Sequence, residues 1–314
     1  GLCGISGQNI NFGLRKICTL NSSNFNSSLM KKRISVLLVV IFSLSVVAQD
    51  RETPPVRLDR ISDNLYQITG GRGANGGMYV GDNEVLIIDS KMDKTSVDGI
   101  YKATFEITGK PITYLINTHS DGDHINGNLF FPKPVTIVAH KNCRAEFLHP
   151  GRNGSPSEWQ KEERQPFIPE ITFTDKMNLY LGKKVVELHY FGVGHTTGDI
   201  VVYFPEEKTA FIGDQVFYGR PQLIHSYKGG NSFEHVKTTQ RMLDELDAEK
   251  FCSGHAEIMT RADIENHLTA MAAFQKKVKS LVANGKSLEE VQAAFEENEG
   301  RLVESVYSEV VTSN

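Results

Sequence analysis

The chain has 314 residues, of which 39% are hydrophobic, and its composition is that of a globular protein rather than a disordered or fibrous one. This length accommodates one large domain or two small ones, with a sizeable core. The 34 basic and 38 acidic residues give a net charge of −4, whereas a polyanion binder is expected to be basic. Nucleic acid and anionic membrane surfaces are therefore disfavoured as partners, and a small-molecule substrate is favoured.

The first 48 residues differ in kind from the rest. Met30 opens a short basic segment, and an apolar run of about fifteen residues follows from Ile34 to Ala48. A basic start, a short apolar run and small residues before a cleavage point are typical of a signal peptide. We therefore predict a signal peptide at 30–48, cleaved after Ala48, and an upstream or non-native leader at 1–29, with a genuine extended leader as the alternative.

Removal of this segment changes the charge and the cysteine content. The 48 residues hold five of the basic side chains and no acidic ones, which leaves 29 positive against 38 negative charges, a net charge of about −9. Cys143 and Cys252 remain; neither has metal-site spacing, so we expect both to be structural, although export would permit a disulfide. No lipobox cysteine and no second long apolar run follow. We expect a periplasmic or secreted bacterial protein without a stable membrane anchor.

The first half of the mature chain predicts short strands around one clear helix. Glycine-rich segments separate the first strands, and Lys94–Thr108 carries apolar residues at helical spacing before a Gly-Lys-Pro breaker. The segment 150–170 is rich in glycine, proline and charge, and we interpret it as a rim or lid loop. Trp159 and Arg164 in it could contact substrate, and a solvated rim explains them equally well. The expected strands are 65–69, 78–80, 84–88, 112–117 and 135–139, and the expected helices are 94–108 and 140–149.

The second half repeats this organisation without a sequence repeat. A capping box from Ser287 to Glu290 begins a last helical segment that either packs on the body or forms a homodimer contact. Two β-rich halves flanked by helices favour a layered α/β sandwich over a doubly wound sheet. We predict a main domain at 49–283 and a C-terminal helical extension at 284–314. The expected strands are 171–174, 178–181, 185–191, 200–204 and 209–212, and the expected helices are 232–246 and 262–282.

The sequence His119-Ser120-Asp121-Gly122-Asp123-His124 directly follows the apolar strand 112–117. Imidazole and carboxylate are the ligands of borderline divalent metals. Alone, such a string also fits a calcium-like turn or a solvated acidic loop. Three later segments, 194–199, 213–215 and 253–255, each place an acid or an imidazole beside a glycine at the end of a predicted strand. Together the four segments indicate a two-metal hydrolase.

These motifs resemble those of the metallo-β-lactamase superfamily, whose four-layer αββα sandwich holds one or two metals at a sheet edge. The resemblance covers residues 60–260, and it departs at Asp121, where the family motif His-x-His-x-Asp-His has histidine. It implies a first metal held by His119, Asp121 and His195, a second held by Asp123, His124 and His255, and Asp214 as the bridging ligand. It also implies that Asn117, Thr118, Thr196 and Thr197 orient the ligands.

Two such cations would bind a bridging hydroxide and stabilise the charge that develops on attack, with Asp123 as the catalytic residue that orients the nucleophile. An aspartate at position 121 changes the net charge of the predicted metal centre. Three carboxylates and a hydroxide balance two divalent ions, whereas a histidine at 121 would leave one positive charge. We therefore expect less acidic bound water, weaker attraction of anionic substrates and stronger competition of iron or manganese with zinc. Because aspartate is shorter than histidine, the first site could also be weak or empty.

The residue types at Asp214 and Phe217 indicate which substrate class within the superfamily this chain resembles. Lactamases of the cysteine-ligand subclass carry cysteine and, three residues on, lysine at these positions, while glyoxalase-type thioesterases, lactonases and phosphodiesterases carry aspartate at the first. The resemblance therefore implies a dinuclear zinc hydrolase of an ester, lactone or amide, with β-lactamase activity as a side reaction or the true one, and the signal-peptide pattern predicts that it is exported. The alternatives are an iron-dependent oxidoreductase and a degenerate binding protein.

The remaining histidines carry less information. His225 lies eleven positions after Asp214, in a segment where substrate-facing loops occur in such enzymes, and we keep it as a candidate site residue. The others are expected to be surface or packing residues: His140, His149, His189, His235 and His267.

Overall fold

The structure is a computed structural model that describes residues 53–313. The signal peptide and leader predicted at 1–48 lie outside the described residues. Within the described part, no helix combines the length and the apolar character that a membrane span requires.

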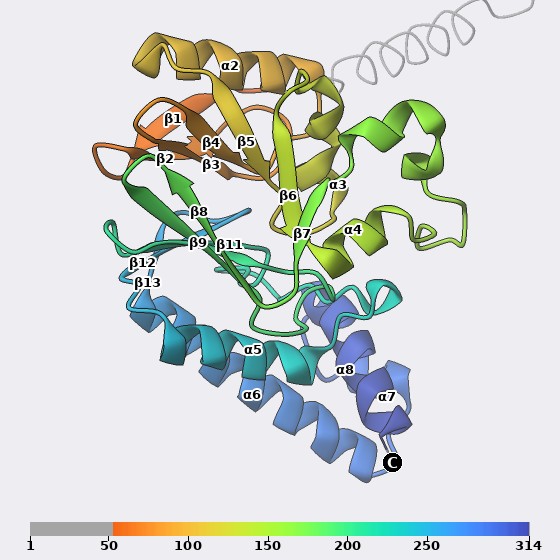
Figure 1. Ribbon diagram of the computed structural model, residues 1–314. Coiled ribbons are helices and arrows are strands. Elements are labelled where there is room, and N and C mark those ends of the chain that lie inside the picture. Colours follow the sequence, from red (N-terminus) through yellow and green to blue (C-terminus); the bar gives the residue numbers. More distant parts are fainter. Residues whose placement is uncertain (1–52, 314) are drawn as a thin grey trace, which may run out of the picture. The chain divides into compact units, whose positions relative to one another are not determined.

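Two mixed sheets form the centre of the fold (Figure 1). The first half of the chain builds a seven-stranded sheet in the order β1 to β7, and the second half a six-stranded sheet in the order β13-β12-β11-β10-β9-β8. Parallel pairing runs from β4 to β7 and between β11 and β12. The strands are β1 (Arg57–Arg60), β2 (Leu65–Thr69), β3 (Gly76–Val80), β4 (Val85–Ile88), β5 (Ile112–Ile116), β6 (Thr136–His140), β7 (Ile171–Phe173), β8 (Lys176–Leu181), β9 (Lys184–His189), β10 (Val201–Phe204), β11 (Thr209–Gly213), β12 (Lys250–Ser253) and β13 (Met259–Thr260).

Helices cover the outer face of each sheet, so the layers run helix, sheet, sheet, helix, and the αββα prediction is confirmed. Helix α2 lies on the first sheet, and α5 and α6 lie on the second (Figure 1). The helices are α2 (Lys94–Thr108), α3 (Gly122–Ile125), α4 (Lys141–Phe147), α5 (Ser232–Glu245), α6 (Arg261–Ala283), α7 (Leu288–Gln292) and α8 (Gly300–Thr312). Short 3₁₀ helices lie at Asn126–Phe130, Glu158–Gln160, Glu162–Phe167, Ser226–Lys228 and Glu297–Glu299.

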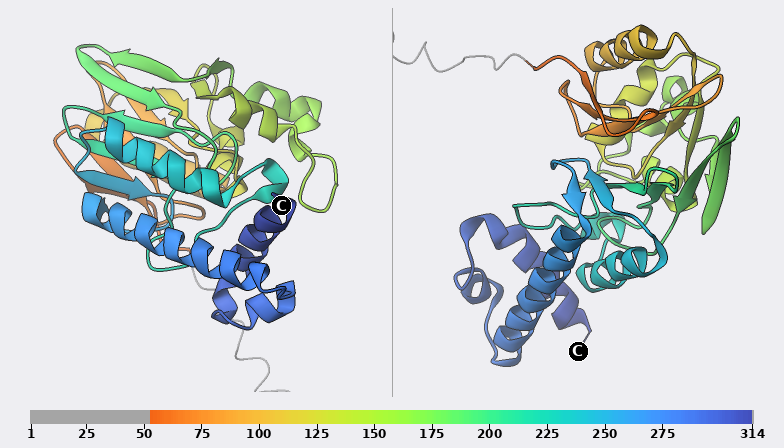
Figure 2. Two further views of the ribbon diagram at one scale, coloured as in Figure 1. Left: turned by 90° about the horizontal axis from the view of Figure 1, so that it is seen from below. Right: turned by 90° about the vertical axis from the view of Figure 1, so that its left-hand side faces the viewer.

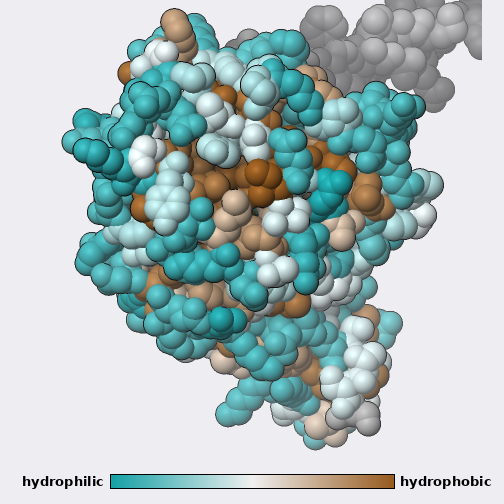
Figure 3. Space-filling model, in the orientation of Figure 1, coloured by the Kyte–Doolittle hydropathy of each residue, from teal (hydrophilic) through white to brown (hydrophobic). Residues whose placement is uncertain are grey.

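The core between the sheets is apolar and aromatic. The ring of Phe204 on β10 lies 4.5 Å from that of Tyr79 on β3 and 5.9 Å from that of Phe211 on β11, measured between centroids. Cys252 is buried in the same cluster, and both Cys143 and Cys252 are free and buried, as expected for structural cysteines. On the face drawn in Figure 3, hydrophilic residues dominate, and hydrophobic ones gather mainly in a band across its middle.

The predicted C-terminal helices are present, and they pack on the body. Helices α6 and α8 lie side by side (Figure 2). Val303 and Val306 of α8 share an apolar cluster with Met271 and Val278 of α6. The capping box of Ser287 and Glu290 opens α7, as the sequence indicates. A homodimer contact through this region stays a prediction.

The structure corrects two features of the sequence-based picture. Two strands were not anticipated: β1 is largely exposed and charged, and β13 is only two residues long. The strand expected before the motif at 253–255 is β12, Lys250–Ser253. The segment 150–170 contains two 3₁₀ helices, and Trp159 is buried against Phe147 at a centroid distance of 4.8 Å. Trp159 is therefore a packing residue, which differs from both alternatives that the sequence left open, a substrate contact and a solvated rim.

Replacement of Phe204 by alanine tests the packing of the two sheets. The ring is fully buried, so its loss should lower the free energy of unfolding by about 3–5 kcal/mol. Tyr180→Ala, on an exposed strand position, is the matched control and should cost less than about 1 kcal/mol. Urea denaturation measures both, and equal losses would contradict the assigned core.

Candidate metal centre

The site lies where β5, β11 and β12 end. Two glycines allow these strand ends to approach closely. Gly213 follows a bulge and has a φ of +52°, and a Cβ there would lie 2.6 Å from the Thr118 hydroxyl oxygen. A Cβ at Gly254 would lie 2.5 Å from both Asp214 Oδ1 and His124 Cε1. Any larger residue at either position would push the loops apart, so the glycines beside the predicted ligands have a steric role.

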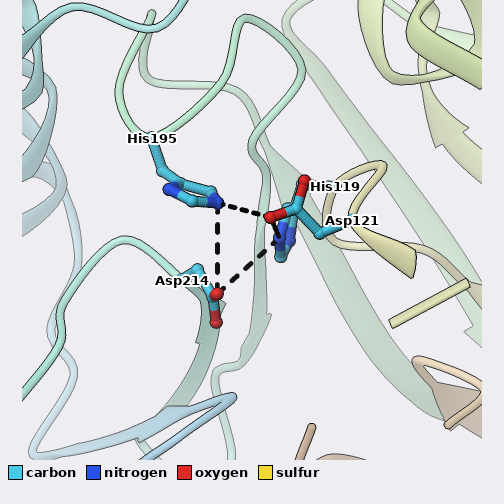
Figure 4. Close-up of side chains that lie close together, drawn as sticks. All are labelled: His119, Asp121, His195 and Asp214. Carbon is cyan, nitrogen blue, oxygen red and sulfur yellow. Dashed lines mark hydrogen bonds and ion pairs between the residues drawn. The ribbon is translucent and has the colours of Figure 1, made fainter. Parts of the chain in front are cut away.

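The first group of side chains consists of His119, Asp121, His195 and Asp214, whose ligand atoms lie within 4.8 Å of one another. They come from three loops and point toward one another (Figure 4). Asp121 Oδ2 lies 2.9 Å from His195 Nε2 and 3.6 Å from His119 Nε2. Asp214 Oδ2 lies 3.9 Å from His119 Nε2 and 4.0 Å from His195 Nε2.

The second group consists of Asp123, His124 and His255, again within 4.8 Å of one another. His255 Nε2 lies 3.0 Å from Asp123 Oδ2 and 3.3 Å from Asp214 Oδ2. His124 Nε2 lies 3.2 Å from Asp214 Oδ1. The carboxylate of Asp214 thus faces both groups. The structure therefore brings all seven predicted ligands together in the two sets that the resemblance implies.

The histidine rings are oriented with Nε2 facing the centre. His124 Nδ1 donates to Asp89 Oδ2 at 2.7 Å, His195 Nδ1 to the Leu223 carbonyl at 2.8 Å, and His119 Nδ1 to the Thr118 hydroxyl at 3.1 Å. Among the described residues, the Nε2 atoms of His119 and His124 and the Oδ1 atom of Asp214 are buried without a hydrogen-bond partner. Buried polar atoms are rarely left unpaired, and ligating histidines commonly donate their other nitrogen in this way. The donor set therefore fits borderline divalent metals.

Asp89 is an orienting residue that the sequence analysis did not identify. It follows β4 with a φ of +58°, a region that aspartate tolerates better than most residues. Besides His124, its carboxylate accepts hydrogen bonds from the backbone N–H and the hydroxyl of Thr118, at 2.9 and 2.8 Å. One buried carboxylate thereby fixes the loop 118–124, which supplies ligands to both groups. The available signal was an acidic residue directly after a fully buried strand.

The other expected orienting residues also have defined partners. The side chains of Asn117 and Asn128 exchange hydrogen bonds, which connect the loop 117–124 to the turn that follows it. The Thr196 backbone N–H and hydroxyl donate to Asp199, and those of Thr197 donate to Glu146. These contacts fix the loops that carry His119 and His195.

Asp121 has two partners that the sequence analysis did not assign to it. Its Oδ2 atom accepts a hydrogen bond from His225 Nε2 at 2.8 Å, and its Oδ1 atom pairs with Lys228 Nζ at 2.6 Å. The side chains of Asp121 and Lys228 are only 12% and 10% exposed. The sequence predicts that three carboxylates and a hydroxide balance the charge of two divalent ions. Lys228 adds one positive charge that this prediction does not include.

The charges of the cluster stabilise one another. Burial alone would raise the pKa of Asp214, but His124 and His255 hold it well below its usual range. Burial likewise favours neutral His195 and His255, yet Asp121 raises the pKa of His195, and Asp123 and Asp214 raise that of His255, each to about 9. Without metal, the cluster is therefore held together by protonated imidazoles and ionised carboxylates.

Comparisons with known proteins agree with this fold. The family model described as the metallo-beta-lactamase superfamily matches residues 69–255. The type 2 metallo-beta-lactamase of Elizabethkingia meningoseptica is 23% identical over 80% of this chain and 99% of its own length. The alpha subunit of 2,4-dinitroanisole O-demethylase from Nocardioides sp. is 26% identical over 68% of this chain and 61% of its own length.

Solved structures show the same fold. The DIM-1 metallo-beta-lactamase superposes with a TM-score of 0.59 at 20% identity, over 71% of this chain and 99% of the lactamase. A metallo-beta-lactamase from Pontibacter korlensis gives a TM-score of 0.58 at 16% identity, over 69% of this chain and 99% of its own. The fold and the paired ligand groups define the class of metallo-β-lactamase-fold proteins. The chain belongs to the metallo-beta-lactamase superfamily.

Replacement of Asp89 by asparagine tests the orienting role of this carboxylate. The amide is neutral and holds the His124 ring less firmly, so affinity for divalent metal should fall about 10–100-fold. Competition with a chromogenic chelator measures the affinity, and Asp59→Asn, at an exposed position, serves as the control. Unchanged metal affinity in Asp89→Asn would contradict this role.

The raised pKa values predict how stability depends on pH in the metal-free protein. Imidazoles with a folded-state pKa of about 9 and an ordinary value of 6.5 contribute stability below pH 6.5 that is lost as pH rises through 9. Urea unfolding with a chelator present should therefore show lower stability at pH 9.5 than at pH 6. Saturating zinc should remove this loss, because metal replaces the protons. Chelated protein that is equally stable at both values would contradict the charge assignment.

Proposed function

We propose that this protein is an exported metal-dependent hydrolase that cleaves an ester, lactone or amide bond at a two-metal centre, with zinc as the expected metal. The observation that carries the proposal is the placement of Asp214 between two groups of imidazole and carboxylate donors, with buried Nε2 atoms left unpaired. Export rests on the signal-peptide pattern at 30–48.

Two divalent ions in such a site lower the pKa of water and polarise the scissile carbonyl. The chain's own contribution is to hold the charges and to move a proton. Asp123 is the most exposed carboxylate of the cluster, with 29% of its side chain accessible against 12% for Asp121 and 3% for Asp214. Its Oδ2 atom lies 3.0 Å from His255 Nε2, on the side where both would hold the second metal, which leaves Oδ1 to take a proton from the attacking water and return it to the leaving group.

Asp214 and the residue three positions after it limit which kind of substrate bond the protein is expected to cleave. An aspartate at this position and Phe217 three residues on do not match the cysteine and lysine expected of the resembling lactamase subclass. The relatives named above include lactamases and an O-demethylase subunit, so the family carries more than one chemistry. We therefore favour an ester, lactone or amide as the substrate, with β-lactam hydrolysis as a side reaction or the true one.

A cavity beside the site supports a substrate that carries an acidic group. It has a volume of about 310 Å³, includes His225 in its wall, and receives Arg152 from the segment after α4 and Arg301 from α8. Within residues 53–313, neither arginine has a carboxylate oxygen within 4.0 Å. Glu304 lines the same cavity, so one positive charge is left uncompensated. Guanidinium groups bind carboxylates strongly, which favours an acid-bearing substrate.

The proposal is tested by metal analysis and a substrate panel. Protein purified without added metal and then loaded with zinc should hydrolyse at least one of nitrocefin, a lactone, a thioester and an aryl ester, and a chelator should abolish the activity. Two bound irons with oxygen consumption would instead support the oxidoreductase alternative. Zinc-loaded and manganese-loaded protein inactive on the whole panel would support the degenerate binding protein.

Asp123→Asn tests the proton-transfer role. The amide cannot accept the proton, so kcat should fall by about 100-fold or more on any substrate that the protein cleaves. Metal content is measured in parallel by mass spectrometry, because loss of a ligand would also lower activity. A variant that keeps its metal and its kcat would contradict the role of Asp123.

Arg301→Ala tests the acid-binding cavity. Loss of a charge-assisted hydrogen bond should raise KM about 10-fold for an ester with a free carboxylate, and leave KM unchanged for the matching neutral amide. Arg241→Ala, on the outer surface of α5, is the control. Equal effects on the charged and the neutral substrate would contradict recognition of an acid by this cavity.

A further inference from the structure

We propose that His225 is a ligand of the first metal position, where it supplies the imidazole that the family motif places at residue 121, and that Lys228 is the counter-charge of Asp121. The inference rests on the proposed metal-dependent function. It assigns roles to two residues outside the seven that the motifs indicate.

Three imidazole nitrogens converge on a single carboxylate oxygen. Asp121 Oδ2 lies 2.8 Å from His225 Nε2, 2.9 Å from His195 Nε2 and 3.6 Å from His119 Nε2. The ring centroids of His195 and His225 are 4.5 Å apart. Donor atoms that share one zinc ion at about 2.0–2.1 Å lie about 3.3 Å apart in a tetrahedral site. His225 Nε2 thus contacts the same carboxylate oxygen, at nearly the same distance, as the candidate ligand His195, although it lies outside the group whose donor atoms are all within 4.8 Å of one another.

The backbone around His225 is bound directly to His195. The His225 backbone N–H donates to the His195 carbonyl at 2.8 Å, and His195 Nδ1 donates to the Leu223 carbonyl at 2.8 Å. After His225, the backbone N–H groups of Lys228 and Gly230 both donate to its carbonyl, at 2.8 and 3.0 Å. The two imidazoles are thus fixed relative to each other by main-chain hydrogen bonds. A ligand needs this preorganisation, whereas a packing histidine does not.

Lys228 occupies the other oxygen of Asp121. Its Nζ atom lies 2.6 Å from Asp121 Oδ1, 2.9 Å from Ser120 Oγ and 3.1 Å from the Ser120 carbonyl. All three donor positions of the ammonium group are therefore used, and only Asp121 Oδ2 is left to face the imidazoles. The lysine also restores the positive charge that replacement of histidine by aspartate removes. Together, Asp121, His225 and Lys228 thus supply one imidazole and no net charge, as the single histidine of the family motif at this position does.

The competing interpretation is a hydrogen-bonded network in place of the first metal, with a single ion at Asp123, His124 and His255. The two interpretations differ in metal stoichiometry. They also differ in what His225 does, because a network residue affects stability whereas a ligand affects the affinity of one ion.

His225→Gln separates them. Protein stripped by a chelator is titrated with Co²⁺ and with Zn²⁺, and bound metal is counted by mass spectrometry. We expect two ions in the unmodified chain, and in His225→Gln an affinity for one ion that is lower by at least about 10-fold, with the other unchanged. X-ray absorption should show fewer imidazole ligands per metal. The control is His149→Gln, at an exposed position, which should bind as the unmodified chain does.

The outcomes distinguish this inference from the proposed function. Two ions bound by His225→Gln with unchanged affinities would overturn the role of His225, and one ion bound by the unmodified chain would support the network; both leave a metal-dependent hydrolase in place. An unmodified chain that binds no metal, or a His255→Gln variant that binds as the unmodified chain does, would overturn the proposed function itself.

Lys228→Met tests the counter-charge. Removal of a cation beside a ligand should raise the affinity for the first ion by at least about 10-fold, because the site becomes more negative. A purely structural lysine would instead weaken binding on replacement. Lys228→Arg, which keeps the charge, should bind as the unmodified chain does and shows whether the position tolerates change. Weaker binding in Lys228→Met, with folding confirmed by circular dichroism, would overturn the counter-charge role.

Discussion

The structure depends on one buried carboxylate that faces four imidazoles. Asp214 lies within 4.0 Å of the Nε2 atoms of His119, His124, His195 and His255, and its side chain is 3% exposed. An isolated charge at this depth would cost several kcal/mol, so the surrounding loops are built to compensate it. Without metal, protonated imidazoles supply the compensation, and divalent cations can supply it in their place. This exchange of protons for metal links folding, metal binding and pH in the same group of residues.

The fold serves this constraint at several levels. The strands β5, β11 and β12 end at one place, and Gly213 and Gly254 allow their loops to approach within contact distance. Asp89 and the Leu223 carbonyl fix the Nδ1 atoms of His124 and His195, so that the Nε2 atoms face inward. The aspartate at residue 121, where the family motif has histidine, is compensated in a similar way. A further buried carboxylate would lower stability here, and Lys228 and His225 contact it from a loop more than a hundred residues away in the sequence.

Much of this was predictable from the sequence, because the relevant signals are local. Helix α2 has the exact bounds 94–108 that its periodicity and its Gly109 stop indicate, and β2 has the exact bounds 65–69. The seven ligand candidates were identifiable because each lies beside a glycine or in a dense motif at a strand end. The strand β1 was missed because its exposed sequence Arg-Leu-Asp-Arg lacks an apolar alternation. The strand β13 was missed because two residues are too short a pattern for a prediction.

The partners of Asp121 and the role of Asp89 required the three-dimensional structure. Lys228 is an ordinary lysine in a Ser-Tyr-Lys-Gly segment, and only the tertiary fold brings it to Asp121. The most direct test of the account is a crystal structure of the zinc-loaded protein with anomalous diffraction at the zinc edge. The account predicts two anomalous peaks, one on each side of the Asp214 carboxylate, with His225 beside the peak that Asp121 also faces. The absence of any peak near Asp214 would contradict it.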